Sequence, residues 1–459
     1  MKWNPHDYKK EVIRFIIGHS CAGIFLDPGL GKTSCIYGAY KILRSGGFVN
    51  RALVISPLRP AVSVWPGERD KWADFRDLRV SVLHDNGKEI PRTSDIDVIN
   101  PEGLSWLLSA AAKRKQWPWD MLVVDESTKF KHPSTLKFKL LKGVLRKFKR
   151  RYIMTGSPAP NGLLDLFGQI YILDMGHSLE PFITRYRRKF FDSVGFGGYT
   201  YIPKEGAAER IQEKIRPLVI RMAAQDYLTL PPLITNDVIV DLPPAALSIY
   251  KQMETQLIAE LQNETVVAQS VGVATMKCRQ IANGGIFKED HSYVQLHNAK
   301  TEAVQDLIAE LGGKSALVAY EFQHDLSRLQ AVFPDAPHLG GGVTARKQRQ
   351  IEVQWNSGCL PVLLAQPQSV AHGLNLQGVG AAVIFHSLTW NLEDYEQLIR
   401  RIWRQGQRER VVVHNVIGRS TIDRAIIAAI RGKDRTQQSL LAHLKGCLGF
   451  TTGMLGPFR

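Results

Sequence analysis

The sequence predicts an α/β protein made of two tandem lobes, each built on a parallel β-sheet, with a mostly helical segment between them. Short apolar runs alternate with longer segments of helical periodicity, and this alternation occurs once in each half of the chain. Such alternation is typical of βαβ units, which build parallel sheets. A glycine-rich loop also joins the first apolar run to a helical segment. The chain of 459 residues has room for two or three domains at about 150 residues each.

The expected strands follow from the apolar runs. In the first half they are Gly23–Leu26, Ala52–Ser56, Ile96–Ile99, Met121–Val124 and Tyr152–Met154. In the second half they are Ala316–Tyr320, Pro361–Ala365, Ala382–His386 and Val411–Val416. Two proline pairs interrupt the region between the halves, so we place a linker at 229–245. The expected domains are a first lobe at 1–175, a helical basic insertion and linker at 176–245, a second lobe at 246–445 and a flexible tail at 446–459.

Composition excludes several classes of protein. Hydrophobic residues make up 44% of the chain and charged residues 22%, which excludes a wholly disordered, collagenous or fibrous protein. The five cysteines form no Cys-x-x-Cys pair, so we expect neither a structural zinc site nor a disulfide framework. The sequence shows no signal-peptide pattern and no apolar run of about 18 residues. We therefore expect a cytoplasmic protein without a membrane partner, in the host cytosol if a phage encodes it.

The net charge of +16 predicts a polyanionic partner such as nucleic acid. Residues 129–151 contain ten Lys or Arg and no acidic residue, and a second basic cluster lies at 185–189. Both clusters are candidate phosphate contacts. A solvated basic surface is the alternative for each of them.

A phosphate-binding loop is predicted at DPGLGKTS, residues 27–34. Its glycines would let the backbone turn tightly, so that amide hydrogens point at phosphate. Lys32 would reach the β- and γ-phosphates, and the Thr33 hydroxyl would hold Mg²⁺. Leu26 takes the place of the first glycine of the longer GxxxxGK[ST] pattern, so only the GLGKT form is present. The candidate nucleotide contacts of this loop are Gly29, Leu30, Gly31, Lys32, Thr33 and Ser34.

An acidic pair, Asp125 and Glu126, directly follows the apolar run Met121–Val124. Carboxylates at the carboxyl ends of parallel strands face the ligand crevice. Phosphoryl transfer needs one acid on the metal and one group that places the attacking water, which we assign to Asp125 and Glu126 respectively. A helix N-cap is the alternative for such a pair.

A basic stripe is predicted on a helix near residue 400. In EDYEQLIRRIWRQGQR, Gln397, Arg401 and Arg404 lie on one helical face. Two arginines on a second lobe can act on the γ-phosphate of a nucleotide held by the first. A solvated basic helix is the alternative.

Taken in order, the motifs GLGKT, DEST, TGSPAPN, GLNL and QLIRRIWRQGQ resemble superfamily 2 helicases and translocases. They are most similar to the Swi/Snf-like branch of double-stranded DNA translocases, in the small single-chain form that phages encode. The resemblance spans about residues 5–435. Its most specific part is similar to QAxDRxxRxGQ, with Arg400 in place of Asp. It implies two RecA-like lobes, an N-terminal ATP-binding lobe and a C-terminal helicase lobe, which use ATP and Mg²⁺.

The resemblance also assigns roles to single residues. It implies a catalytic set of Lys32, Asp125, Glu126, Arg401 and Arg404, and a metal held by Thr33 and Asp125. It adds Gly373 and Gln397 to the nucleotide contacts. It places Thr155 and Ser157 in a motif that couples nucleotide state to lobe movement, with Asn375 near nucleotide and DNA. Arg59 and Trp65 fall in a region that contacts a nucleic-acid strand, so the candidate nucleic-acid contacts are Arg59, Thr155, Ser157 and Asn375.

One position departs from the family pattern. The family has a glutamine near the N-terminus that reads adenine, and here Lys9 occupies that position, preceded by Tyr8. ATP preference over other nucleotides is therefore open, although Tyr8 could stack on the base.

These observations predict a nucleic-acid-dependent ATPase that translocates along double-stranded DNA. Two alternatives remain open: a strand-separating DNA or RNA helicase, and a non-catalytic nucleotide-dependent clamp. A protein partner in a replication, recombination or repair assembly is also compatible with the sequence.

Overall fold

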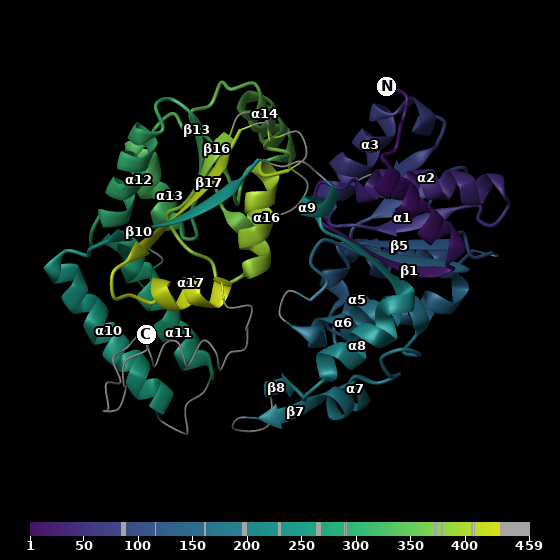
Figure 1. Ribbon diagram of the computed structural model, residues 1–459, viewed down its shortest axis with the longest axis horizontal. Helices are drawn as coiled ribbons and strands as arrows, with labels where there is room; N and C mark the ends of the chain where they lie inside the picture. The colour runs from purple at the N-terminus through teal and green to yellow at the C-terminus, as the bar shows by residue number, and fades with distance from the viewer. Residues whose placement is uncertain are drawn as a thin grey trace. The chain divides into compact units, whose positions relative to one another are not determined.

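The computed structural model describes residues 1–431 except 84–88, 115, 160–161, 195–199, 228–230, 263–267, 289, 291, 371–373, 378–379, 405–406 and 408. The chain divides into two compact units, Met1–Thr229 and Leu230–Arg459 (Figure 1). Each unit contains its own parallel sheet covered by helices, which confirms the predicted α/β class with two tandem RecA-like lobes. Among the described residues, no helix has the length and apolar character required to cross a membrane.

Within its described residues, the first unit is built on a seven-stranded parallel sheet in the order β3-β4-β2-β5-β6-β1-β9. Its strands are β1 (Cys21–Leu26), β2 (Ala52–Ile55), β3 (Val80–Val82), β4 (Ile96–Ile99), β5 (Met121–Asp125), β6 (Arg150–Thr155) and β9 (Val219–Met222). Strands β2, β4 and β5 are buried along their whole length, as expected of a parallel sheet with helices on both faces.

The helices of the first unit lie on both sides of this sheet (Figure 1). On one side are α1 (Asp7–Gly18), α2 (Lys32–Ser45) and α3 (Trp65–Lys71). On the other are α4 (Leu104–Ala112), α5 (Leu136–Val144), α6 (Leu166–Asp174), α7 (Ile183–Phe190) and α8 (Ala207–Ile215), which pack on alternate strand residues such as Leu53 and Leu122. An antiparallel hairpin, β7 (Phe191–Val194) and β8 (Thr200–Pro203), follows α7, and α9 (Ala224–Tyr227) follows β9.

The described part of the second unit holds a six-stranded parallel sheet in the order β10-β17-β16-β13-β15-β14. Its strands are β10 (Leu233–Val240), β13 (Ser315–Ala319), β14 (His338–Leu339), β15 (Val362–Ala365), β16 (Gly380–Phe385) and β17 (Val411–Gly418). A separate antiparallel pair is formed by β11 (Gly285–Phe287) and β12 (Tyr293–Gln295).

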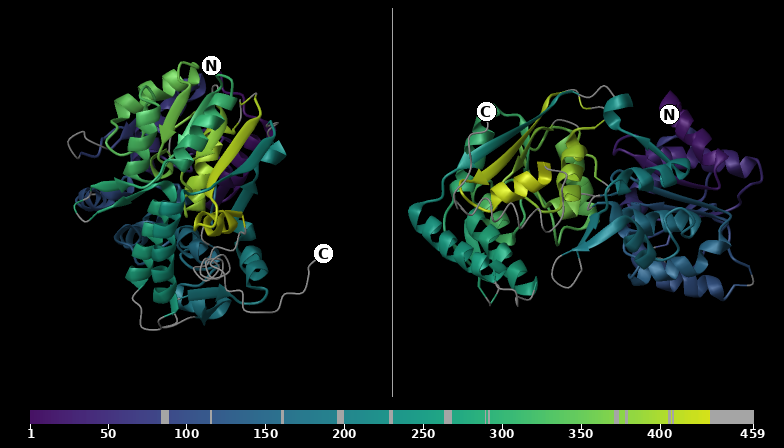
Figure 2. Two further views of the ribbon diagram at one scale, coloured as in Figure 1. Left: turned by 90° about the vertical axis from the view of Figure 1, so that its left-hand side faces the viewer. Right: turned by 60° about the horizontal axis from the view of Figure 1, so that its bottom comes forward.

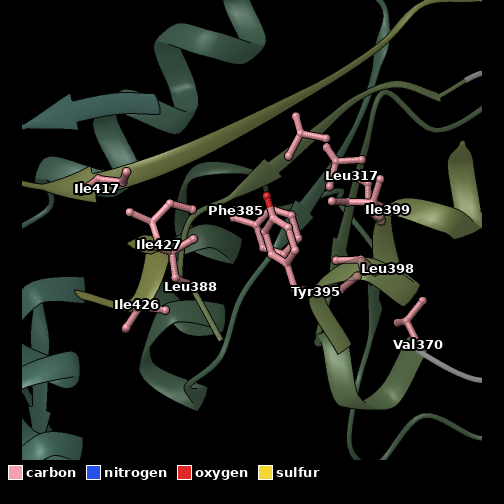
Figure 3. Close-up of a cluster of buried hydrophobic side chains, with 14 of the residues drawn as sticks. Leu317, Val370, Phe385, Leu388, Tyr395, Leu398, Ile399, Ile417, Ile426 and Ile427 are labelled. Carbon is pink, nitrogen blue, oxygen red and sulfur yellow. The ribbon is translucent and has the colours of Figure 1, made fainter. Parts of the chain in front are cut away.

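The helices of the second unit pack on alternate residues of the strands. On one face, Leu317 and Ala319 of β13 pack with α10 (Pro244–Gln262), α11 (Ala268–Asn283), α14 (Ala345–Asn356), α15 (Pro367–Val370), α16 (Leu392–Ile402) and α17 (Asp423–Arg431). On the opposite face, Ala316 and Val318 pack with α12 (Ala299–Glu310) and α13 (Gln323–Val332). Helices α10 and α11 run side by side (Figure 2). Figure 3 shows the first of these cores, in which the rings of Phe385 and Tyr395 stack with centroids 4.4 Å apart.

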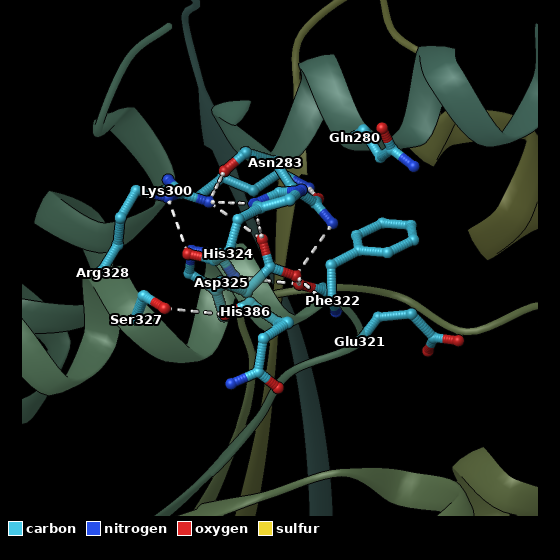
Figure 4. A network of polar contacts seen from close by, with 12 residues as sticks. Gln280, Asn283, Lys300, Glu321, Phe322, His324, Asp325, Ser327, Arg328 and His386 are labelled. Atoms are coloured by element: carbon cyan, nitrogen blue, oxygen red, sulfur yellow. Dashed lines mark hydrogen bonds and ion pairs between the residues drawn. The ribbon is translucent and has the colours of Figure 1, made fainter. Parts of the chain in front are cut away.

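A buried polar network joins several helices of the second unit (Figure 4). Its centre is the fully buried carboxylate of Asp325, which accepts hydrogen bonds from Arg328 Nη2 at 2.9 Å and Ser387 Oγ at 2.6 Å. Lys300 lies in the same region, with Nζ 2.5 Å from the carboxylate of Asp423 and 2.7 Å from Asn283 Oδ1. These contacts link α11, α12, α13 and α17 to the end of β16.

Every strand expected from the sequence is present, with ends that coincide or differ by at most two residues. The segment 176–245, where a helical basic insertion and linker were expected, also gives an edge strand to each sheet. Strand β9 pairs with β1, and β10 pairs with β17. The proline pairs taken to mark a linker at 229–245 instead flank β10, because proline is tolerated where a strand starts or after it ends. The expected tail at 446–459 lies outside the described residues.

Candidate functional site

Four adjacent strands of the first unit bring the predicted catalytic residues to one edge of the sheet. In the order β2-β5-β6-β1, these strands end at Ser56, at the pair Asp125–Glu126, at Thr155 and at the loop 27–31. Because the strands are parallel, their carboxyl ends lie at the same edge, where ligands of open α/β sheets bind. Residues up to about 130 positions apart in the sequence are thus neighbours in the fold.

The phosphate loop has the backbone geometry that its glycines allow. Gly29 and Gly31 have φ values of 94° and 76°, in the left-handed region that strains other residues. Helix α2 starts at Lys32, so its first backbone N–H groups and the positive end of its dipole are directed at the loop. Lys32 Nζ donates to the carbonyl of Leu26 at 2.8 Å, which folds the side chain back over the loop. Strand, loop and helix therefore follow in the predicted order.

Asp125 is buried at the end of β5 and held by neutral donors, one of which is the backbone N–H of Glu126, 3.1 Å from its Oδ1. Its Oδ2 accepts hydrogen bonds from Ser56 Oγ at 2.9 Å and from Trp65 Nε1 at 3.2 Å. Burial, with the neighbouring charge of Glu126, raises the pKa of Asp125 to about 6, and the charge of Lys32 opposes that rise. A carboxylate with this environment gains stability from a cation, so its chemistry suits a metal ligand.

Glu126 occupies a strained backbone position beside Asp125. Its φ of 49° lies in the left-handed region, which costs a residue other than glycine about 1–3 kcal/mol. Its Oε2 lies 3.5 Å from Thr155 Oγ1 on the neighbouring strand. A side chain at Gly156 would place its Cβ 2.7 Å from Pro28 Cδ, so the TGS turn lies directly against the phosphate loop. Strain at such a residue is typical of a functional position.

The predicted nucleic-acid contacts of the first unit are not all at the surface. Trp65 is fully buried and supports Asp125, so the expectation of a strand contact at Trp65 is corrected. Thr155 is fully buried as well, and its hydroxyl also accepts from the backbone N–H of Ser157 at 3.2 Å, so in this structure it lies in the interior beside Glu126. Arg59 and Ser157 are half-buried and remain candidates.

The structure divides the basic segment 129–151 into surface and interior residues. Lys131 pairs with Asp165 at 3.1 Å, Arg150 and Arg151 donate to backbone carbonyls, and Lys137 is half-buried. The exposed members of the segment are Lys129, Lys139, Lys142, Arg146, Lys147 and Lys149. In the second basic cluster, on α7, Arg185, Arg188 and Lys189 are exposed.

Tyr8 and Lys9 on α1 lie against the phosphate loop. The Tyr8 hydroxyl donates to the carbonyl of Leu30 at 3.3 Å, and its side chain is buried. The Tyr8 ring lies 5.7 Å from the ring of His6 and 5.4 Å from that of Tyr227, so a base could stack on it only if one of them moved. Lys9 Nζ reaches Ser34 Oγ in the first turn of α2.

In the second unit, the arginine helix and the GLNL segment meet. Arg401 Nη1 donates to the carbonyl of Leu374 at 3.3 Å. Gln397 is buried, its Nε2 donates to Glu393 Oε1 at 3.0 Å, and its Oε1 has no hydrogen-bond partner within the described residues. The side-chain Oδ1 of Asn375 is likewise buried and has no hydrogen-bond partner within the described residues. Arg404 follows two residues after α16 ends, and Gly373 and Gly406 lie outside the described residues.

The sequence did not predict the supporting role of three residues. Ser56 and Trp65 hold Asp125, and Glu352 of α14 accepts from the backbone N–H of Asn375 at 2.9 Å. Burial raises the pKa of Glu352, and the hydrogen bond from Asn375, together with the charges of Arg349, Arg404 and Arg401, opposes that rise. Ser56 could have been found, because it directly follows a predicted strand. Trp65 and Glu352 carry no such signal.

Comparison with known proteins identifies the family to which this chain is similar. The SNF2-related domain matches residues 2–285, and the Helicase conserved C-terminal domain matches residues 299–406. The chain is 30% identical to protein p41 of Acyrthosiphon pisum secondary endosymbiont phage 1 over 468 residues, which cover 96% of this chain and 99% of p41.

Longer relatives match with lower identity. The DNA repair and recombination protein RAD54-like of Gallus gallus is 22% identical over 89% of this chain and 62% of that protein. An uncharacterized ATP-dependent helicase of Mycoplasma pneumoniae is 23% identical over 92% of this chain and 40% of that protein. The chain thus spans less than two thirds of these longer relatives.

Among solved structures, the Sulfolobus solfataricus SWI2/SNF2 ATPase core in complex with dsDNA aligns over 98% of this chain and 95% of that one, with 21% identity and a TM-score of 0.46. The family assignment rests on the sequence matches, which extend over more than half of the chain. The chain belongs to the SNF2-related family of superfamily 2 helicases and is an ATP-dependent enzyme of that family.

Proposed function

We propose that this protein is an ATP-driven motor that translocates along double-stranded DNA. The observation that carries the proposal is the convergence of Lys32, Asp125 and Glu126 at one edge of the first sheet, in a member of the SNF2-related family. The longer relatives that share the family include proteins named for DNA repair and recombination. The high positive charge of this chain supports a polyanionic track.

Each candidate catalytic or metal-binding residue of the first unit has a proposed role that its position supports. Lys32 and the N–H groups at the start of α2 would bind the β- and γ-phosphates of ATP. Thr33 and Asp125 offer hydroxyl and carboxylate oxygens, the donors that Mg²⁺ prefers. Mg²⁺, when bound, would neutralise charge that develops on the phosphates. Glu126 would orient and polarise the attacking water.

Turnover would also draw on the second unit. Arg401 and Arg404 are the candidates to stabilise charge on the γ-phosphate, a contribution on the order of 10³–10⁵ in rate for an arginine finger. Gln397 and Asn375 each offer a buried amide oxygen that accepts no hydrogen bond from the described residues, which suits groups that receive a ligand.

The contacts with DNA would be made to phosphates and would not depend on sequence. Arg59, Ser157 and Asn375 are the candidates at the motifs, and the exposed lysines of α5 are candidates outside them. Binding through Z phosphates weakens with salt, with a log–log slope of about −0.9Z for duplex DNA. Replacement of both Lys139 and Lys142 by Gln should reduce that slope by about 2 if both contact phosphates. An unchanged slope would assign them to the solvated surface.

The first test is ATP hydrolysis by the wild type and by Lys32→Ala, with no polymer, single-stranded DNA, duplex DNA or RNA. We expect strong stimulation by duplex DNA and loss of turnover in Lys32→Ala. Lys41→Ala is the matched control on the same helix, because Lys41 forms a surface pair with Asp77 at 2.8 Å. Turnover that does not depend on Lys32 would contradict the proposal, and turnover stimulated mainly by single strands or RNA would favour a strand-separating helicase.

Translocation itself is tested by displacement of a third strand from a DNA triplex. A motor that tracks on intact duplex displaces the third strand without separation of the duplex below it. Unwinding of a tailed duplex without triplex displacement would instead identify a strand-separating helicase. ATP-dependent binding with neither activity would identify a clamp.

A further inference from the structure

The feature that the proposed mechanism leaves unused is the buried side chain of Lys9 on α1. Its ammonium group lies against the phosphate loop, beside Gly31 and Ser34. Lys9 Nζ is 3.5 Å from Ser34 Oγ, and a Cβ added to Gly31 would lie 2.6 Å from it. The φ of 76° favours glycine at position 31, and a side chain there would displace the ammonium group of Lys9 from its present place.

No carboxylate compensates the charge of Lys9. Its side chain is 9% exposed, and no acidic group of the described residues lies within ion-pair distance of its Nζ. The charged groups that act on it from a distance are Glu68 and Lys71 of α3, and they have opposite signs. Burial lowers the pKa of Lys9, as expected for an ammonium group with a single long contact to a neutral hydroxyl. An uncompensated buried ammonium is costly unless an anion binds beside it.

The chemistry of a lysine selects the kind of ligand that Lys9 can contact. An ammonium group offers three donors and no acceptor. It cannot accept a hydrogen bond from the amino group of a base, so it cannot distinguish adenine in the way that an amide side chain can. It suits the oxygens of a phosphate chain, which the first turn of α2 already attracts.

We propose that Lys9 is a second phosphate-binding lysine, and that it makes nucleotide recognition depend on the triphosphate rather than on the base. This inference rests on the proposed nucleotide site at the same loop. Ser34 Oγ donates to the carbonyl of Gly31 at 2.8 Å, so Ser34 holds the loop and Lys9 together. A triphosphate bound there would be contacted by both Lys32 and Lys9.

The test measures the binding of ATP, GTP and inorganic tripolyphosphate to the full chain by isothermal titration calorimetry. For the wild type we expect affinities for ATP and GTP within about tenfold of each other, and clear binding of tripolyphosphate. Lys9→Met keeps the aliphatic stem and removes the charge. It should weaken all three ligands by about ten- to hundredfold, the range for loss of a charged hydrogen bond. The KM for ATP should rise by a similar factor with little change in kcat.

Two further variants make the result decisive. Lys10→Met is the matched control, because Lys10 lies on the same helix, is exposed and pairs with Asp7 at 2.9 Å, and it should bind all three ligands as the wild type does. Lys9→Gln is the second variant at the site, and it should lose tripolyphosphate binding while it gains preference for ATP over GTP. Thermal melting without ligand should show both Lys9 variants to be at least as stable as the wild type, because an uncompensated charge is removed.

The possible results distinguish a failure of this inference from a failure of the proposed function. Wild-type binding in Lys9→Met, with loss of binding in Lys32→Ala, would overturn the role of Lys9 and leave the proposed function intact. If the wild type preferred ATP over GTP by more than a hundredfold, the proposal that recognition does not depend on the base would be wrong. Failure of the wild type to bind any of the three ligands would instead contradict the proposed nucleotide site itself.

Discussion

Asp325 of the second unit and Asp125 of the first differ in how their buried charge is compensated. In the second unit, Asp325 is fully buried and surrounded by donors, which include Arg328, Ser387 and the backbone N–H of Phe322 at 3.0 Å (Figure 4). Burial alone would raise the pKa of Asp325, but the hydrogen bond from His324 and the positive charges around it hold that pKa well below its usual value. In the first unit, Asp125 has a pKa raised to about 6 and Lys9 has no counter-ion among the described residues.

This difference distinguishes a structural network from a ligand site. A buried charge whose hydrogen bonds are complete holds helices together and has no capacity left for a ligand. A buried charge with neutral or distant partners destabilises the fold until a ligand supplies the missing charge. By this criterion, we expect the carboxyl edge of the first sheet to bind charged ligands, whereas the Asp325 network joins α11, α12, α13 and α17 as structure.

The largest expected effect is on turnover, at Glu126. Glu126→Gln keeps the shape of the side chain and removes the carboxylate that would polarise water. We expect DNA-stimulated ATP hydrolysis to fall by about 10²–10⁴, the usual contribution of a general base. ATP affinity and melting temperature should stay close to those of the wild type, because Glu126 is a strained residue whose carboxylate makes only a long contact with Thr155. Steady-state kinetics and calorimetry measure these quantities.

Glu102→Gln is the control for Glu126, because Glu102 is an exposed acid of the same unit that accepts from the side chain of Asn100. It should hydrolyse ATP as the wild type does. If Glu126→Gln retained more than about a tenth of wild-type turnover, a general-base role for Glu126 would be wrong.

The next effect is on stability, at Asp325. Asp325→Ala removes the acceptor of a buried guanidinium group, since Arg328 is only 4% exposed. Breaking a buried pair in this way destabilises a protein by about 3–5 kcal/mol, so the urea midpoint of the second unit should fall strongly. Far-ultraviolet circular dichroism through a urea titration measures it.

Asp241→Asn provides the contrast for Asp325. Asp241 pairs with Arg419 at 2.5 Å, but its side chain is 71% exposed, so its loss should leave the urea midpoint unchanged. Equal sensitivity at the two positions would contradict the argument that burial makes the Asp325 network structural.

A smaller effect on folding stability, opposite in sign to that at Asp325, is expected at Asp125. Asp125→Asn removes a buried charge and keeps an oxygen that can accept from Ser56 and Trp65. We expect the variant to be more stable than the wild type at neutral pH by about 1–2 kcal/mol, which is part of the roughly 3 kcal/mol that a two-unit pKa shift represents. ATP turnover should be lost, because the variant lacks the charge that binds Mg²⁺. A clear loss of stability in Asp125→Asn would show that its charge is compensated within the fold.

The sequence predicted those features of the fold and of the candidate site whose residues are contiguous along the chain. The strands were found because each is a mostly apolar run whose residues are largely buried. The strands that were missed are short or lie at sheet edges: β14 has two residues, β3 has three, and β10 has exposed positions. The loop 27–34 and the pair Asp125–Glu126 were found because each motif is local. The contacts of Trp65 with Asp125 and of Lys9 with Ser34 depend on how α3 and α1 pack, which no local pattern records.

The smallest effect, and the most specific to the comparison, is the pH dependence of stability. The pKa of Asp125 is 3.8 in the unfolded chain and about 6 in the folded one, so between these values the folded state binds more protons. The contribution of Asp125 to stability is therefore fully present below about pH 4 and is lost as pH rises through about 6. For Asp325 the sign is reversed, because its lowered pKa adds stability above about 3.8 that is lost as pH falls. Urea midpoints of the wild type and Asp125→Asn should thus nearly coincide at about pH 4 and diverge towards pH 7 in favour of the variant. A difference that did not change with pH would show that Asp125 has a normal pKa and that the edge of the first sheet is as well compensated as the network of the second unit.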